Sequence, residues 1–268
     1  MEELVVDVES FRGGTGPSRA PHIGFVNLNG ETAPKIGAAY DVVPASALPL
    51  QDLAVPETPR TFFDLDLHAF YSGNLPDGLI GSNEGLLRIQ VDTRAPQDLS
   101  NEVTASFVTK FRVRDDEYAP SFASRGVFRN VLFENFVNLR LGLIELDSDL
   151  SVYFDKVKKV IDDSGLAQVD VLKGIPYLDV GTKLVNSLVQ NFGKNADDVL
   201  WSELPILQLH PLIGSVFLRA GIYAVIDRSS EQQGFPGKLS YLNGELRDEH
   251  GPLLTTHLIF SVGLRPSE

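Results

Sequence analysis

The stretch "TFFDLDLHAFY", residues 61–71, alternates apolar and polar side chains with a period of two. In an extended chain, Asp64, Asp66 and His68 fall on one face, and the apolar residues between them fall on the other. This period predicts a strand with one face in a hydrophobic core and one face in water. The same alternation recurs in residues 86–92, so we expect a mainly β protein.

Further β-like stretches follow along the chain, at residues 102–114, 130–146, 200–210, 214–228 and 253–265. Residues 130–146 are apolar on both faces in places, which favours one central strand or two strands joined by a bulge at Gly142. Numerous strands separated by short turn signals predict a β-sandwich or jelly-roll-like architecture.

The β pattern is interrupted between residues 148 and 194. Apolar residues recur at helical spacing in 148–164 and again in 179–192, and each stretch ends at a glycine, Gly165 or Gly193. Apolar residues three and four apart form one face of a helix, and glycine commonly ends a helix. Two such helices bury too little surface to be stable alone. We therefore predict a two-helix insertion at about 148–194, between two strands of the sandwich.

The first sixty residues contain short β-like pieces separated by glycine and proline. Residues 41–59 alone contain four prolines, and proline interrupts both helices and central strands. Compact domains seldom keep long irregular connections without a use for them. We predict that residues 1–60 form an N-terminal arm with short strands, packed on the sandwich or on a neighbouring subunit. Residues 61–268 then form the sandwich with its insertion.

The composition excludes several classes of protein. The 268 residues carry a formal net charge of −13 and no cysteine. This charge repels nucleic acid, and the lack of cysteine excludes disulfides and thiolate metal sites. The first ten residues lack the basic and apolar regions of a signal peptide, so we expect a cytoplasmic protein by default. Polar residues, Arg219 among them, interrupt the most apolar stretch, residues 204–226, so we expect no transmembrane segment.

The triplet Asp64, Asp66 and His68 is a candidate metal site. Alternate residues of a strand lie about 7 Å apart, so two neighbours can bind one ion. Carboxylate and imidazole ligands together suit zinc, manganese or iron better than calcium. The alternative is that these residues line the solvated face of a strand, with the two carboxylates paired to the basic residues of 110–114 on a neighbouring strand.

A second acidic group consists of Asp147, Asp149, Asp197 and Asp198, at the two ends of the predicted insertion. Carboxylates in loops at one end of a sandwich suit calcium, which takes several oxygen ligands. This arrangement resembles that of C2-type domains, although the chain lacks the Asp-Pro-Tyr loop of that family. The resemblance implies calcium-dependent contact with a membrane surface. The alternative is that these aspartates favour helix N-termini through the helix dipole.

Trp201 is the only tryptophan and follows the predicted insertion. We expect it to pack the helices onto the sheet or, alternatively, to anchor a partner protein. The sequence contains no serine-nucleophile elbow, zinc-protease motif, dinucleotide fingerprint or phosphate loop. This absence weakens the case for an enzyme without closing it, because catalytic residues also assemble from distant segments.

We therefore expect a non-enzymatic binding or assembly module that acts through protein–protein contacts. It would self-associate or form a subunit of a larger complex, because long arms and exposed strand edges suit contacts between chains. One alternative is a calcium-dependent β-sandwich that binds a membrane surface or a ligand. A second alternative is a metal-dependent hydrolase. Calcium or a transition metal is the only cofactor that these hypotheses require.

Overall fold

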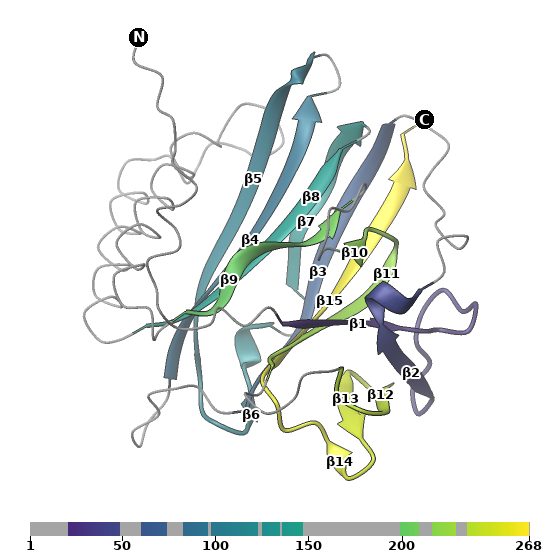
Figure 1. Cartoon of the computed structure of the whole chain (residues 1–268), viewed down its shortest axis with the longest axis vertical. Helices are drawn as coiled ribbons and strands as arrows, with labels where there is room; N and C mark the ends of the chain where they lie inside the picture. The colour runs from purple at the N-terminus through teal and green to yellow at the C-terminus, as the bar shows by residue number, and fades with distance from the viewer. Residues whose placement is uncertain are drawn as a thin grey trace.

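A computed structural model of the chain describes residues 21–48, 60–73, 83–95, 98–122, 125–134, 136–146, 199–208, 216–228 and 235–267. The predicted helical insertion at about 148–194 lies outside these residues. The described residues form two β-sheets (Figure 1), which confirms the prediction of a mainly β fold. In the described part of the chain, no helix is long and apolar enough to cross a membrane.

The larger sheet has ten strands, and all of its pairs are antiparallel. In spatial order they are β14 (Gly251–Pro252), β13 (Glu245–Asp248), β12 (Leu239–Leu242), β2 (Ala39–Pro44), β1 (His22–Val26), β11 (Gly221–Ile226), β15 (His257–Pro266), β3 (Arg60–Ser72) and β6 (Glu117–Tyr118). The tenth strand, β7 (Arg125–Glu134), pairs with β3 on the same side as β6.

The smaller sheet has five strands. In spatial order they are β10 (Val216–Phe217), β9 (Val199–Gln208), β8 (Val137–Leu146), β4 (Asn83–Ala95) and β5 (Asp98–Val113). The short pair of β9 and β10 is parallel, and the other pairs are antiparallel. Figure 1 shows the long strands β5, β4 and β8 side by side, with β3 and β15 of the larger sheet next to them.

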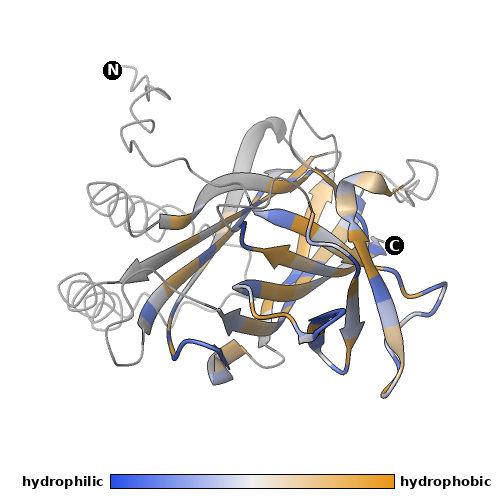
Figure 2. Ribbon diagram, turned by 60° about the horizontal axis from the view of Figure 1, so that its bottom comes forward, coloured by the Kyte–Doolittle hydropathy of each residue, from blue (hydrophilic) through white to orange (hydrophobic). Residues whose placement is uncertain are grey.

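The main hydrophobic core lies between the two sheets. Phe63, Leu65 and Leu67 of β3 are at most 1% exposed and belong to the same cluster of buried residues as Leu87 and Ile89 of β4. Each fully buried side chain of this size stabilises the fold by about 1.5–3 kcal/mol. Figure 2 shows the alternation of hydrophobic and hydrophilic residues along the strands. The period of two therefore reports correctly which side of β3 faces the main core as far as Leu67, whereas beyond it Phe70 enters this core and Ala69 packs against the second cluster described below.

The larger sheet curls and covers a second hydrophobic cluster on its other face. Tyr223 and Val225 of β11 belong to the main core, whereas Ala224 and Ile226 belong to the second cluster, so β11 is buried on both faces. Tyr40 of β2 packs into the second cluster together with residues of β12 and β15. This half-barrel curl differs from the two flat layers of a simple sandwich, because one sheet alone encloses the second cluster.

Residues 130–146 form parts of two strands that belong to different sheets. β7 pairs with β3, whereas β8 pairs with β4 and β9. β7 ends at Glu134 and β8 begins at Val137, and Gly142 lies inside β8 opposite Arg88. Gly142 therefore does not join the two strands, although the pairing of β8 with β9 shifts register between Leu141 and Leu143, around this glycine. Phe133 and Val137 both enter the main core, which explains why this stretch is apolar where it changes sheets.

The described part of the predicted N-terminal arm belongs to the larger sheet. β1 pairs with β11 through residues such as Phe25 and Tyr223, and β2 pairs with β12 through Tyr40 and Tyr241. The β1 and β2 strands therefore lie inside the sheet rather than at its border. Residues 1–20 and most of the proline-rich stretch 41–59 lie outside the described residues.

Candidate functional site

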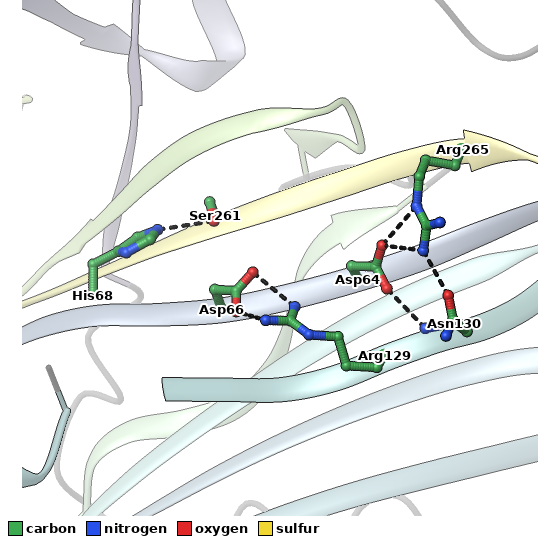
Figure 3. A network of polar contacts seen from close by, with 7 residues as sticks. All are labelled: Asp64, Asp66, His68, Arg129, Asn130, Ser261 and Arg265. Carbon is green, nitrogen blue, oxygen red and sulfur yellow. Dashed lines mark hydrogen bonds and ion pairs between the residues drawn. The ribbon is translucent and has the colours of Figure 1, made fainter. Parts of the chain in front are cut away.

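The outward face of β3 carries ion pairs at the predicted metal triplet (Figure 3). Asp66 accepts two hydrogen bonds from the guanidinium of Arg129 on β7, with 2.8 Å between Nη1 and Oδ2. Asp66 is opposite Gly126 in the pairing of β3 with β7, and Arg129 lies in the stretch of β7 where this pairing shifts register. Planar bidentate pairs of this kind fix the orientation of both groups. The Asp66 carboxylate is therefore already occupied by an arginine.

Asp64 has three polar contacts from two neighbouring strands. Its Oδ2 accepts hydrogen bonds from Nε and Nη2 of Arg265 on β15, at 3.0 and 2.8 Å. Its Oδ1 accepts a hydrogen bond of 2.7 Å from the backbone N–H of Asn130. Asn130 has a positive φ of 54°, a backbone conformation that asparagine adopts more readily than most residues. Asp64 therefore holds the β7 backbone as well as an arginine.

His68 lies apart from the two carboxylates and contacts β15. Its Nε2 is 2.8 Å from the hydroxyl oxygen of Ser261. Burial lowers the pKa of His68, and the nearby Asp66 opposes this shift. The pairing of β3 with β15 shifts register between Ile259 and Phe260, next to His68. This irregularity turns the end of the triplet away from the simple alternation that the sequence predicts.

Within the described residues, no three His, Asp or Glu side chains lie close enough together to hold a metal ion. The metal site at Asp64, Asp66 and His68 thus remains a prediction, and the geometry favours the ion-pair alternative. The prediction that Asp64 and Asp66 pair with the basic residues of 110–114 is wrong. Lys110 belongs to the other sheet, where its Nζ lies 3.1 Å from Glu84 Oε2.

The remaining candidate residues lie elsewhere. Asp147, Asp149, Asp197 and Asp198 are outside the described residues, so their calcium site stays a prediction. Trp201 is 1% exposed and packs in the main core, with its ring centroid 6.5 Å from that of Phe70 on the other sheet. A side chain buried to this extent is not available to anchor a partner on the surface. Trp201 instead joins the two sheets.

A groove of about 620 Å³ lies where the two ends of the curled sheet face each other. His68 and Ala69 of β3 and Tyr118 of β6 line one side, and Tyr241 of β12 and Glu245 of β13 line the other. Figure 1 shows β6 and the β12–β13 hairpin at the same end of the molecule. The volume of the groove falls in the range of about 300–1,000 Å³ that is typical of ligand sites.

The rim of the groove is held by hydrogen bonds between the hairpin and the loop before β2. Asn243 and Gly244 have φ values of 52° and 93°, which a two-residue hairpin turn between antiparallel strands requires. The Asn243 Oδ1 accepts a hydrogen bond of 2.7 Å from the N–H of Gly37. The N–H of Lys35 donates to the Tyr40 hydroxyl at 2.9 Å. These contacts preorganise the rim, which reduces the cost of ordering it on binding.

The charged side chains that line the groove already have partners. The Lys35 Nζ lies 2.7 Å from Glu31 Oε1, and Glu245 Oε2 lies 3.6 Å from Arg247 Nη1. Burial lowers the pKa of His68, so its imidazole is neutral at pH 7. The described lining includes no serine, threonine or aspartate. The charged groups of the described lining are thus held in ion pairs, and its imidazole is neutral.

Two tyrosines give the groove its aromatic walls. Burial raises the pKa of Tyr118 to about 12, with a further contribution from Glu245, and burial also raises the pKa of Tyr241. Both phenols therefore remain protonated at pH 7 and can donate hydrogen bonds.

Aromatic residues behind the groove support Tyr118. Its ring lies 5.0 Å from that of Tyr71, in an edge-on arrangement, and Tyr71 stacks on His257 at 5.2 Å. The three residues are neighbours across β6, β3 and β15. Aromatic pairs at these separations contribute about 0.5–1.5 kcal/mol each beyond their burial. Tyr118 is thus a rigid part of the groove wall.

Sequence analysis did not find this groove. Tyr118 and Tyr241 are far apart in the chain, and only the closure of the curled sheet brings them to one site. The local signal that could have been used is the dipeptide Asn243-Gly244, which is typical of a hairpin between two short strands. Comparisons with models of protein families, with curated proteins and with solved structures found no match. The proposals for function therefore rest on the groove and its surroundings.

Proposed function

We propose that the chain is a non-enzymatic binding or assembly module, and that it holds a segment of another protein in the groove between β6 and the β12–β13 hairpin. The observation that carries this proposal is the groove itself, with Tyr118 and Tyr241 on facing walls. Aromatic residues on a rigid support are the usual anchors of protein interfaces. Lys35 pairs closely with Glu31, whereas Glu245 has only a longer contact of 3.6 Å with Arg247, so the groove offers mainly apolar surface and neutral hydrogen-bonding groups beside one partly exposed carboxylate.

An exposed apolar side chain at the rim supports a protein partner. Ile36 lines the groove and is 98% exposed. A single exposed apolar residue is common on protein surfaces. Ile36, however, is both a lining residue of the groove and almost fully exposed, so a partner bound there could cover it. A partner that covers this residue would gain about 1.5–3 kcal/mol from its burial.

Further parts of the proposal concern the whole chain. We propose a sandwich-like arrangement of the two sheets, with a two-helix insertion at about 148–194 and with the N-terminal arm, residues 1–60, packed on the sandwich or on a neighbouring subunit. The partner is a protein or a second copy of the chain, because the net charge of −13 disfavours nucleic acid. Cytoplasmic residence and peripheral membrane contact remain expectations. The calcium-dependent and hydrolase alternatives also remain predictions.

The test is site-specific photo-crosslinking from position 36. A photoreactive amino acid in place of Ile36 should give one discrete cross-linked band, to a partner protein or to a second copy of the chain. Leu254 is a matched control, because it is also apolar and exposed, at 66%, and does not line the groove. Equal cross-linking from positions 36 and 254, or no protein adduct from position 36, would contradict the proposed function.

A further inference from the structure

The two tyrosine hydroxyls of the groove have no hydrogen-bond partner among the described residues. Tyr241 is 6% exposed, but its hydroxyl is not among the buried unpartnered atoms of the described residues, so it is open to solvent. Tyr241 lines the groove, which is the space from which a partner can reach it. Tyr118 lines the opposite wall and is half-buried. The groove therefore offers two neutral donors that a ligand can satisfy.

The lining favours a ligand with unpaired carbonyl groups and compact apolar rings. The phenols of Tyr118 and Tyr241 and the side-chain amide of Asn243 are donors, and among the described residues Asn243 uses only its side-chain oxygen. Pro34 and Pro120 add flat apolar surface beside these rings. A polyproline II segment matches this chemistry. Its carbonyl groups have no internal hydrogen bonds, and its rings pack well between aromatic side chains.

The described lining does not favour the addition of a β-strand inside the groove. Strand addition needs a row of unpaired backbone groups on an exposed edge. At the groove, the N–H of Ala119 already donates to the carbonyl of Phe70, at 2.8 Å. The walls are formed by side chains from several strands and loops. Contacts to the ligand must therefore come mainly from side chains.

Charge complementarity favours a basic residue in the ligand. Glu245 lines the groove, and its side chain is 46% exposed. Its negative charge also contributes to the raised pKa of Tyr118, although the positive charge of Arg247 opposes this contribution. The whole chain carries a net charge of −13, which attracts cationic partners over longer distances. A lysine or arginine next to the proline-containing segment would thus gain from this negative charge.

We infer that the groove binds a proline-containing segment in the polyproline II conformation with an adjacent lysine or arginine. This inference rests on the proposed function, because it names the partner of the same groove. The two phenol hydroxyls and the Asn243 amide donate to carbonyl groups of the segment, its proline rings pack between Tyr118 and Tyr241, and its cation lies near Glu245.

The experiment measures the affinity of the full chain for labelled peptides by fluorescence anisotropy. The main probe is a ten-residue peptide with six prolines and one arginine, and its two controls are a glycine–serine peptide with the same arginine and a proline peptide with glutamate in its place. We expect the main probe to bind at least tenfold more tightly than either control. A further probe, SFRGGTGPSRAP, copies residues 10–21, and its binding would identify the ligand as an arm of a second copy.

Conservative variants assign the binding to the groove. Tyr241→Phe removes only a hydroxyl and should weaken binding of the main probe about fivefold, since one neutral hydrogen bond is lost. Tyr71→Phe is the matched control, because Tyr71 does not line the groove and its hydroxyl contacts Asp116 at 3.3 Å. Glu245→Gln should weaken the arginine peptide and leave an arginine-free proline peptide unchanged.

The outcomes separate this inference from the proposed function. If position 36 cross-links to a protein but the proline peptide binds no better than the glycine–serine control, the proposed function stands and the ligand assignment is wrong. If Tyr241→Phe and Tyr71→Phe bind the peptide equally well, the peptide does not use the groove as inferred. Saturable binding of a small uncharged aromatic compound in the groove, without peptide binding, would also overturn the inference.

Discussion

The indole Nε1 of Trp201 donates a hydrogen bond to Oδ1 of Asp227, with 3.1 Å between the two atoms. Trp201 lies on β9 of the smaller sheet, and Asp227 directly follows β11 of the larger sheet. The backbone N–H of Asp227 in turn donates to the carbonyl of Thr256, which directly precedes β15. The only tryptophan of the chain therefore connects the smaller sheet with two neighbouring strands of the larger sheet.

Replacing Trp201 with phenylalanine should destabilise the fold by about 2–4 kcal/mol, because it leaves a cavity in the main core and removes the hydrogen bond to Asp227. The measurement is chemical denaturation followed by circular dichroism. Asp227→Asn keeps the volume and should cost less, about 1 kcal/mol. A cost for Trp201→Phe below that for Asp227→Asn would show that the indole does not fill the core.

The two aspartates of the predicted triplet should differ in their contribution to stability. The Asp64 side chain is 14% exposed and accepts hydrogen bonds from Arg265 and from the backbone N–H of Asn130. Asp64→Ala leaves these donors without an acceptor and should cost about 1–3 kcal/mol. Asp66→Ala should cost less than about 1 kcal/mol, because the Asp66–Arg129 pair is more exposed, at 30% and 55%.

Urea denaturation of the two variants measures this difference, and thermal unfolding with and without a chelator tests the metal alternative. An ion-pair role predicts the same melting temperature in both conditions for the natural chain. A drop in melting temperature with chelator that Asp66→Ala and His68→Ala both abolish would instead establish a bound metal.

The orientation of the β3 side chains follows from sequence, whereas their partners do not. The period of two places Asp64 and Asp66 outward and Leu65 inward, and both placements agree with the structure. The pairing of Asp66 with Arg129 and of Asp64 with Arg265 depends on which strands lie next to β3. The alternation within one strand contains no information about which strands lie beside it. From sequence alone, the basic residues of β5 were therefore as plausible as Arg129 and Arg265 as partners of the two aspartates.

For a related reason, the groove could not be predicted from the sequence. Tyr118 belongs to a strand of two residues, which is too short to show any period. Tyr241 belongs to a strand of four residues beside a hairpin turn. Their proximity results from the curl of the larger sheet, and this curl reflects the accumulated twist of many paired strands. Local patterns predict strands and turns, but not the closure of a sheet.

Acid should destabilise the protein through His257. Burial lowers the pKa of His257 from 6.5 to about 4, although its hydrogen bond to the Thr255 carbonyl opposes the shift. The unfolded chain therefore binds a proton at this residue at higher pH than the folded chain. The part of the free energy of unfolding that depends on a neutral His257 is fully present above pH 6.5. It is lost as the pH falls toward 4. Between pH 7 and 4.5 the loss should be about 2–3 kcal/mol.

The measurement compares the free energy of unfolding at pH 7 and pH 4.5 in the natural chain and in His257→Gln. The variant should lose most of this pH dependence, whatever its stability at pH 7. His250→Gln is the control, because His250 lies on the surface with its side chain 84% exposed, and the pH dependence should stay unchanged. His22 and His68 also have pKa values lowered mainly by burial, so part of the loss should persist in the His257 variant.

Gly73 should tolerate no side chain, because the backbone of residues 254–256 lies directly against it. A Cβ at Gly73 would collide with the Leu254 carbonyl oxygen and lie 2.8 Å from the backbone nitrogen of Thr256. Backbone atoms held in place by their neighbours cannot move aside as a flexible side chain can, so Gly73→Ala should cost about 2–3 kcal/mol. At Gly237, by contrast, no atom of the described residues lies within 4 Å of the position that a Cβ would take, and Gly237→Ala should change stability by less than about 0.5 kcal/mol. Urea denaturation of both variants measures the contrast, and equal costs would mean that the chain around Gly73 packs less closely than described.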